Sequence, residues 1–187
     1  MQEQRWQAAF WLLVVGSWVT GVVYGKWLDG DTGFFVDLSQ AVSVTTPFSL
    51  EFWWQPLAYF VLTVISVFAL SQLGFGAGAG VFLFARGTYD STLITQLETT
   101  VGGWSLTNVP IDESFKILII GLILAVNLPL CLWAAHLGTQ RSVYLLQRLR
   151  GVPVKPEFGS VPLSSFLMIL AASVAVGLIA TFLFSYA

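Results

Sequence analysis

The sequence predicts an all-α integral membrane protein with five transmembrane helices, and three observations lead to that prediction. Of its 187 residues, 56% are apolar and only 10% are charged, with a mean hydropathy of +0.79. A soluble domain carries about 25% charged residues, so this chain has too few polar side chains to cover a water-exposed surface. Several apolar runs also approach the ~20 residues that a helix needs to cross a bilayer. Finally, the segments between those runs carry charge of opposite sign.

Four of the apolar runs are long enough to be transmembrane helices by themselves, at about residues 7–25, 56–73, 115–137 and 161–184. A fifth segment, 74–97, is rich in glycine and contains Arg86 and Asp90, so hydropathy alone leaves its crossing undecided. Glycine frees backbone groups that can line a cavity, so this third helix is either continuous or broken and re-entrant. Together the spans form a single transmembrane domain over residues 1–187.

Charge placement favours the crossing by 74–97. The segment 138–160 has four Lys or Arg residues against one acid, which places it in the cytoplasm under the positive-inside rule. The segment 27–54 has four acidic residues and no Lys or Arg, and it has apolar residues at helical spacing, Phe34, Leu38 and Val42, typical of a stretch lying on the membrane. Five crossings put these two segments on opposite faces, with the N-terminus cytoplasmic and the C-terminus outside. The expected location is the cell inner (plasma) membrane, and an internal membrane fits the same pattern.

Pairs of small residues four apart predict close helix packing in three places. The pairs are Gly21 and Gly25, Gly76 and Gly80, and Ala171 and Ala175. The glycine run 74–80 is not a phosphate-binding loop, because it lacks the Gly-Lys-Ser/Thr ending that such loops carry. A cavity lined by freed backbone is the alternative to packing for this run.

Arg86 and Asp90 are four residues apart, so their side chains share one face of a helix. A lone charge at mid-bilayer costs about 2.5–3.5 kcal/mol, which favours an intramembrane ion pair. The functional interpretation is an ion or proton pathway or a contact with a partner subunit. The alternative is that both side chains reach the outer headgroups independently. In the next span, Pro129 follows Asn127 and predicts a kink.

Basic residues follow that span, where the helix is expected to continue past the membrane and to stop at Gly151. Arg141 and Arg148 are seven apart and share a face, and with Arg150 they form a candidate docking surface for a cytoplasmic partner or anionic lipid. An ordinary basic flank of a transmembrane helix is an equally good interpretation.

Several functional classes lack support in the sequence. There is no HExxH or GxSxG motif, which argues against the corresponding hydrolases and predicts a chain that is not an enzyme. The single cysteine, Cys131, excludes a disulfide framework, and the single histidine, His136, is too few for a histidine-rich metal site. We therefore expect no cofactor. The net charge of −2 gives no reason to expect nucleic acid as a partner.

The order of these features resembles the stage II sporulation protein M family. A first span ending in Gly21 and Gly25 is followed by an outer stretch containing FFVDLSQ, then by two closely joined spans with an Arg86-Gly87 step. A span with Asn127 and Pro129, the basic stretch Arg141–Lys155 and a final apolar span complete the pattern. The resemblance implies a non-catalytic subunit: the sporulation member acts in an engulfment complex with cell-wall-degrading partners, and relatives accompany ABC-type transport systems. It implies no catalytic residues.

The leading hypothesis is therefore a membrane subunit that scaffolds or anchors partner proteins. Its expected partners are membrane lipids, other membrane or cytoplasmic subunits such as an ABC-type ATPase, or further copies of the same chain. A permease-type component of an ABC-like or secondary transport system is the alternative, because Gly-rich spans with ionisable residues are typical of transporter binding sites. A lipid- or pigment-associated subunit is a third interpretation.

Overall fold

The structure, a computed structural model, describes residues 2–27, 54–103, 111–151 and 157–184, and all regular secondary structure in these ranges is helical. Its long helices are α1 (Gln2–Trp27), α3 (Gln55–Ser71), α4 (Ala77–Gly103), α5 (Ile111–Leu122), α6 (Leu128–Leu149) and α7 (Glu157–Phe184). A 3-10 turn, η1 (Leu73–Gly76), joins α3 to α4, and a π-helical segment, η2 (Ile123–Asn127), joins α5 to α6. The expected outer stretch with Phe34, Leu38 and Val42 lies outside the described residues.

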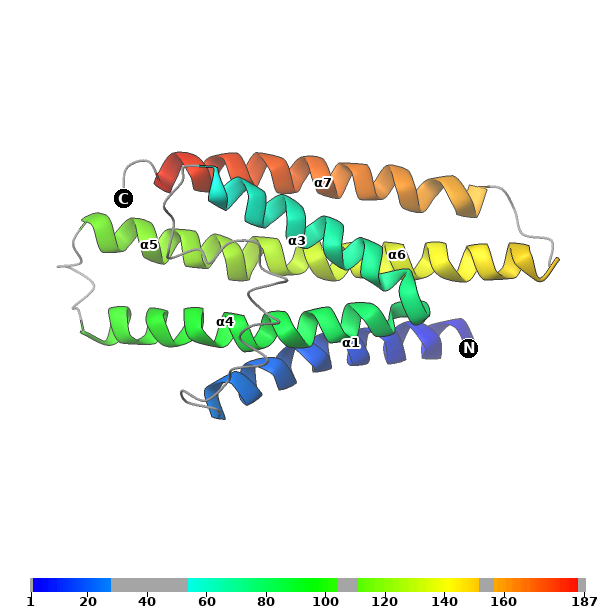
Figure 1. The fold of residues 1–187 in the computed structure, drawn as a ribbon, viewed down its shortest axis with the longest axis horizontal. Helices are drawn as coiled ribbons and strands as arrows, with labels where there is room; N and C mark the ends of the chain where they lie inside the picture. Colours follow the sequence, from blue (N-terminus) through cyan, green and yellow to red (C-terminus); the bar gives the residue numbers. More distant parts are fainter. Residues whose placement is uncertain (1, 28–53, 104–110, 152–156, 185–187) are drawn as a thin grey trace.

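The helices form an elongated bundle in which the chain runs back and forth along the long axis (Figure 1). α1, α4 and α7 run in one direction, and α3 and the continuous α5–η2–α6 rod run in the other, so α1 begins at one end and α7 finishes at the other. α1 packs mainly on α4, whereas α3 lies against both α6 and α7. The bundle interior therefore lies between α3, α4 and α6.

Three helical stretches of the described residues are long and apolar enough to cross a membrane, namely Ala8–Trp27, Ile117–Leu149 and Leu163–Phe184. Gln55–Ser71 and Leu73–Thr99 pass the same test together, with a bend of 108° between them. The all-helical prediction is confirmed for the described residues, and the length and apolar composition of these helices suggest a membrane protein.

The distribution of side chains supports the same conclusion. Large apolar side chains point outward, such as Leu12 on α1, which is 77% exposed, and Met168 on α7, which is 75% exposed. By contrast, three charged or amide side chains lie inside: Arg86, Asp90 and Asn127 are at most 4% exposed. A soluble domain buries the first class and exposes the second, so this arrangement suits a lipid environment.

The glycine run begins as a turn and only then becomes a helix. Gly74, Phe75 and Gly76 have φ angles of 60°, 55° and 99°, which end α3 and reverse the chain before α4 begins at Ala77. This left-handed backbone suits glycine, which has no Cβ to clash. Gly76 thus lies in the turn and Gly80 in α4, and both glycines of the predicted pair pack closely on α1: a Cβ on Gly76 would lie 3.2 Å from the Phe10 ring, and one on Gly80 would lie 3.1 Å from Leu13. The structure corrects the start of the third helix, and it shows α4 continuing as helix through Gly103.

α1 and α4 approach so closely that their backbones touch at glycine. A Cβ on Gly21 would collide with the carbonyl oxygen of Phe84, and one on Gly25 would lie 2.8 Å from the carbonyl oxygen of Thr88. From the other side, a Cβ on Gly87 would collide with the Trp18 carbonyl oxygen. Gly21 and Gly25 therefore lie at the helix contact that their spacing predicts.

On α7 the structure places the packing face elsewhere than the sequence predicts. Ala171 and Ala175 are exposed, whereas Ser173 and Gly177, also four apart, are buried against α3. A Cβ on Gly177 would lie 3.1 Å from the Cα of Leu57. The two pairs are offset by two residues, about 200° around the helix, so they lie on nearly opposite faces of one apolar helix. The position of α3 decides which face is buried.

Candidate functional site

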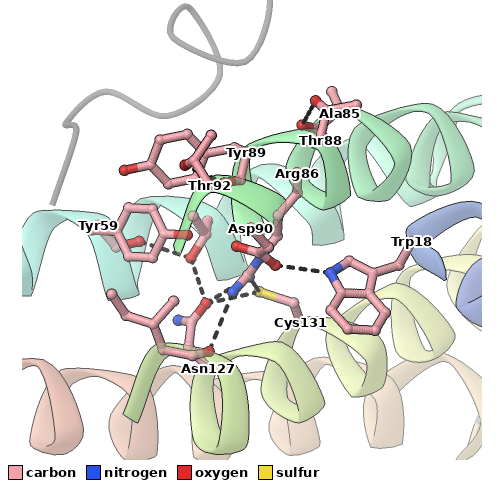
Figure 2. Close-up of polar contacts among 12 residues, drawn as sticks. Trp18, Tyr59, Ala85, Arg86, Thr88, Tyr89, Asp90, Thr92, Asn127 and Cys131 are labelled. Atoms are coloured by element: carbon pink, nitrogen blue, oxygen red, sulfur yellow. Dashed lines mark hydrogen bonds and ion pairs between the residues drawn. The ribbon is translucent and has the colours of Figure 1, made fainter. Parts of the chain in front are cut away.

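The only buried ion pair of the described residues lies in a group of side chains that we call the polar cluster (Figure 2). Most of these side chains come from α3, α4, η2 and α6, and one comes from α1, which packs on α4. The members are Trp18 on α1, Tyr59 and Thr63 on α3, Arg86 and Asp90 on α4, Asn127 on η2, and Cys131 on α6.

Arg86 and Asp90 form the centre of the polar cluster. The Arg86 Nε atom lies 3.3 Å from Asp90 Oδ2, and the two side chains are 3% and 0% exposed. Neither side chain therefore reaches the surface of the bundle, which argues against two charges that reach the headgroups separately. Because the pair is removed from solvent, its attraction is screened far less than that of a surface pair.

Asp90 is also bonded across the α1–α4 contact. Trp18 Nε1 donates a hydrogen bond of 2.8 Å to Asp90 Oδ2, the same oxygen that Arg86 contacts. The glycine contact makes this bond geometrically accessible, because Gly87 lets the Trp18 backbone lie directly on α4. The glycines at the α1–α4 contact thus determine which donor reaches the buried carboxylate.

The Arg86 guanidinium extends from α4 to the η2–α6 rod. Its Nη1 donates to Asn127 Oδ1 at 2.6 Å and to Cys131 Sγ at 3.0 Å, and its Nη2 donates to the Ile123 carbonyl oxygen at 3.4 Å. Arginine suits this position because its planar group presents several donors at once. One side chain therefore links α4 to both η2 and α6.

Asn127 connects the same network to α3 and α7. Its Oδ1 also accepts from Thr63 Oγ1 at 3.3 Å, and its Nδ2 donates to the Phe60 carbonyl oxygen at 3.3 Å. Ser173 Oγ on α7 donates to that same carbonyl oxygen at 2.7 Å. Five helical elements and η2 are thus joined through buried or partly buried hydrogen bonds, and such bonds restrict the relative positions of the helices.

The predicted kink takes the form of a π turn. Leu128 N–H bonds to the Ile123 carbonyl oxygen five residues earlier, and Pro129, which has no N–H to give, follows near the start of α6. The wider turn keeps α5 and α6 in one continuous rod. It also leaves the Ile123 carbonyl oxygen within reach of Arg86 Nη2. The π turn therefore belongs to the site, where such segments often occur.

Two polar atoms of the cluster have no partner within the described residues. Asp90 Oδ1 and the Tyr59 hydroxyl oxygen are both buried without a hydrogen bond. The Tyr59 ring itself is used, because the Arg86 Cζ atom lies 5.8 Å from its centroid, within cation–π range. Buried polar groups are nearly always paired, so these two exceptions call for an explanation.

The sequence predicted that Arg86 pairs with Asp90 but did not connect Asn127 with that pair, and the other cluster members were missed. A signal was present: Tyr59 and Thr63 are four apart in an otherwise apolar helix, and so are Asn127 and Cys131. Polar residues at that spacing share a helix face. Trp18 carried no such signal, because only the contact between α1 and α4 brings it to Asp90.

Of the candidate docking residues, Arg148 and Arg150 lie at the C-terminal end of α6, which projects past the other helices (Figure 1). Arg148 and Arg150 are exposed and Arg141 is half-buried. Leu145 and Leu149, on the same side as Arg148, are 43% and 86% exposed. Gly151, with φ of 71°, ends the helix where the sequence predicts, and its N–H bonds to the Arg148 carbonyl oxygen at 3.1 Å.

The His136 ring contacts side chains on α1 and on its own helix. Its ring stacks on Trp11 with centroids 5.4 Å apart, and its Nε2 atom lies 2.9 Å from Gln140 Nε2. Within the part of the chain that the structure describes, no three His, Cys, Asp or Glu residues are grouped to hold a metal ion.

No family model, no curated protein and no solved structure matches the chain. The resemblance to the stage II sporulation protein M family therefore stays a prediction based on the order of sequence features.

Proposed function

We propose that this chain is a non-catalytic, five-span subunit of the cell inner membrane that anchors a cytoplasmic partner protein through the end of α6. The observation that carries the proposal is the projecting, basic and apolar surface at that end. We call this surface the α6 tip and define it by Leu145, Arg148, Leu149 and Arg150. The resemblance to the stage II sporulation protein M family adds support from the sequence, with an ABC-type ATPase as one partner of the expected class.

The arrangement of the helices supports five crossings. Consecutive long segments run in opposite directions, and the first and last helices finish at opposite ends of the bundle (Figure 1). In this topology α3 and α4 each cross once, with the η1 turn between them. The acidic segment 27–54 then lies outside and the basic segment 138–160 lies in the cytoplasm, as the positive-inside rule requires.

The length of the α5–α6 rod supports a cytoplasmic extension. Ile117–Leu149 is 33 residues long, which corresponds to about 50 Å at 1.5 Å per residue. The hydrocarbon core is only ~30 Å thick, so several turns of this helix extend beyond it. The α6 tip lies at this extension, where Leu149 is 86% exposed. A surface that combines arginine with exposed leucine fits an acidic partner protein with an apolar groove.

The partner can be tested by cross-linking and mass spectrometry on native membranes. The variant Arg141→Gln/Arg148→Gln/Arg150→Gln should retain insertion and lose the cross-linked partner that the wild type recovers. Lys26→Gln is the matched control. Lys26 is an exposed cation in the last turn of α1, and that end of α1 lies at the opposite end of the bundle from the α6 tip (Figure 1). Recovery of the same partner with the triple variant would contradict the proposal. Loss only of binding to vesicles containing anionic lipid would assign the tip to lipid headgroups instead.

A second candidate, a transport component, is favoured by a different observation. Ionisable residues inside membrane-spanning helices commonly mark ion or substrate pathways, and Arg86 and Asp90 are fully enclosed here. Substrate flux through reconstituted vesicles that Asp90→Asn abolishes and the triple arginine variant leaves intact would favour this candidate. The reverse pattern of effects would favour anchoring.

A further inference from the structure

The α6 tip extends a helix face that α3 covers further back along α6. Ser142 Oγ donates a hydrogen bond of 2.9 Å to the Gln72 carbonyl oxygen, directly after the end of α3. Leu145 and Leu149 follow three and seven residues after Ser142, so they lie on the same face of α6. They are 43% and 86% exposed, because α3 has already ended at Ser71. The leucines therefore continue a packing face that has no covering helix among the described residues.

The η1 turn lies at the base of this exposed face. It contacts α6, and it exposes two large apolar side chains, Leu73 and Phe75, to 63% and 43%. Phe75 has a φ of 55° and a ψ of 42°, a left-handed conformation that a residue with a Cβ rarely adopts. A strained backbone that presents an exposed phenylalanine indicates a use for that side chain outside the bundle. We call Leu73, Phe75, Leu145 and Leu149 together the α6–η1 surface.

The depth of Leu149 argues against lipid as the only cover of this surface. A Cβ on Gly76 would lie 3.2 Å from the ring of Phe10, the third residue of the apolar stretch Ala8–Trp27, so η1 lies at the cytoplasmic edge of the hydrocarbon core in the proposed topology. Leu149 is seven residues beyond Ser142, or about 10 Å along the helix. The headgroup layer on each side is only about 5–8 Å thick, so Leu149 reaches water beyond it. A grouped apolar surface in that position is typical of a contact with protein.

Positive charge flanks the α6–η1 surface. Arg148 and Arg150 come directly before and after Leu149, and both are exposed. Arg141 lies one helical turn before Leu145. None of the three arginines takes part in an ion pair of the described residues, and α6 itself contains no Asp or Glu. An apolar stripe with uncompensated cations beside it is complementary to an apolar stripe with acids beside it.

We propose that the α6–η1 surface receives an amphipathic helix of the cytoplasmic partner. The apolar stripe of that helix packs on the leucines and Phe75, and its acidic side chains lie opposite Arg148 and Arg150. The inference rests on the proposed anchoring function and specifies the element that the partner contributes. A helix is the expected element because it takes the place of α3 on a face whose side-chain ridges already pack against a helix. Helices that dock in this way contact their partner at every third or fourth residue.

Photo-cross-linking of the full chain in native membranes can test this inference. A photoreactive phenylalanine analogue is placed at position 75 in one variant and at position 149 in another, and the cross-linked peptides are identified by mass spectrometry. Both positions should react with one segment of one protein, in which apolar residues recur every third or fourth position with Asp or Glu beside them. The same analogue at position 118 is the control. Leu118 is 47% exposed on α5, near the opposite end of the α5–α6 rod, so this position should react with lipid only.

Phe75→Gly separates docking from folding. Glycine suits the φ of 55°, so thermal unfolding of this variant should show little change in stability. The yield of the position-149 adduct should nevertheless fall about 3–10-fold, because a half-exposed phenylalanine has only part of its surface left to bury against a partner. Leu118→Ala should leave that yield unchanged.

Several results would overturn the inference. Adducts at positions 75 and 149 that come from different proteins, from lipid alone or from a second copy of this chain would do so, as would a cross-linked segment without the acidic, amphipathic pattern. If Phe75→Gly leaves the adduct yield unchanged while Arg141→Gln/Arg148→Gln/Arg150→Gln loses the partner, anchoring by the α6 tip stands and only the docking helix is refuted. A wild type that cross-links no cytoplasmic protein would contradict the anchoring function itself.

Discussion

Replacing Arg86 and Asp90 singly and together should reveal a strong coupling between them. Arg86→Leu would leave the buried Asp90 carboxylate with Trp18 as its single donor. Asp90→Leu would leave the Arg86 Nε atom and Trp18 Nε1 without their acceptor. Removing one partner of a buried pair costs about 3–5 kcal/mol, so each variant should lose that much free energy of unfolding.

The double variant should lose less than the sum of the two single losses, because no uncompensated charge stays buried. Contacting residues in one network show coupling of about 0.5–3 kcal/mol, and this buried pair should lie in the upper half of that range. Denaturant unfolding of the four purified proteins in mild detergent, followed by circular dichroism, measures all four values. Asn127 retains Thr63 as a donor in every variant, which limits secondary losses.

The ion pair between Lys26 and Glu98 provides the matched control. Its N–O distance is shorter, 2.7 Å, but its side chains are 40% and 59% exposed. Exposed pairs contribute about 0.2–1 kcal/mol, so the same cycle with alanine should show weak coupling despite the better distance. The reasoning would be refuted by additive losses for Arg86 and Asp90, or by a coupling no larger than that of the exposed pair.

Three further results are expected. Gly21→Ala should lower the free energy of unfolding by about 1–3 kcal/mol, because its methyl group would collide with the Phe84 carbonyl oxygen. Gly16→Ala, which has open space around the new methyl group, should not lower it, and thermal unfolding of the two variants compares them. Trp18→Phe should cost about 1.5–3 kcal/mol by removing a donor to a charged acceptor, while Trp27→Phe, at a side chain that is 88% exposed, should have little effect in the same assay. In a Cys131→Ser background, cysteines at positions 40 and 160 should react with an impermeant thiol reagent from opposite faces of the membrane; reaction from one face would contradict the five-span topology.

Composition and periodicity were sufficient to predict the helical membrane class, because burial of backbone polar groups in lipid allows few alternatives to helices. The end of α6 was also predictable, since Gly151 and the proline after it act locally. The spacing of Gly21 and Gly25 likewise predicted a close helix contact, and the structure identified α4 as the partner. By contrast, Ala171 and Ala175 were chosen from an apolar helix in which several stripes meet the small-residue pattern, and the sequence contains nothing that distinguishes the stripe facing α3.

By itself, the sequence determined that the chain forms apolar helices and that Arg86 and Asp90 share one helix face, because both properties depend on spacing within one segment. Only the tertiary structure decided what that pair meets. Trp18, Tyr59 and Cys131 reach it from three other helices, through an α1–α4 glycine contact and a π turn before Pro129. The physical reason is that a buried charge is satisfied by whichever donors and acceptors the packing brings within about 3 Å, and packing depends on the shapes of all the helices together.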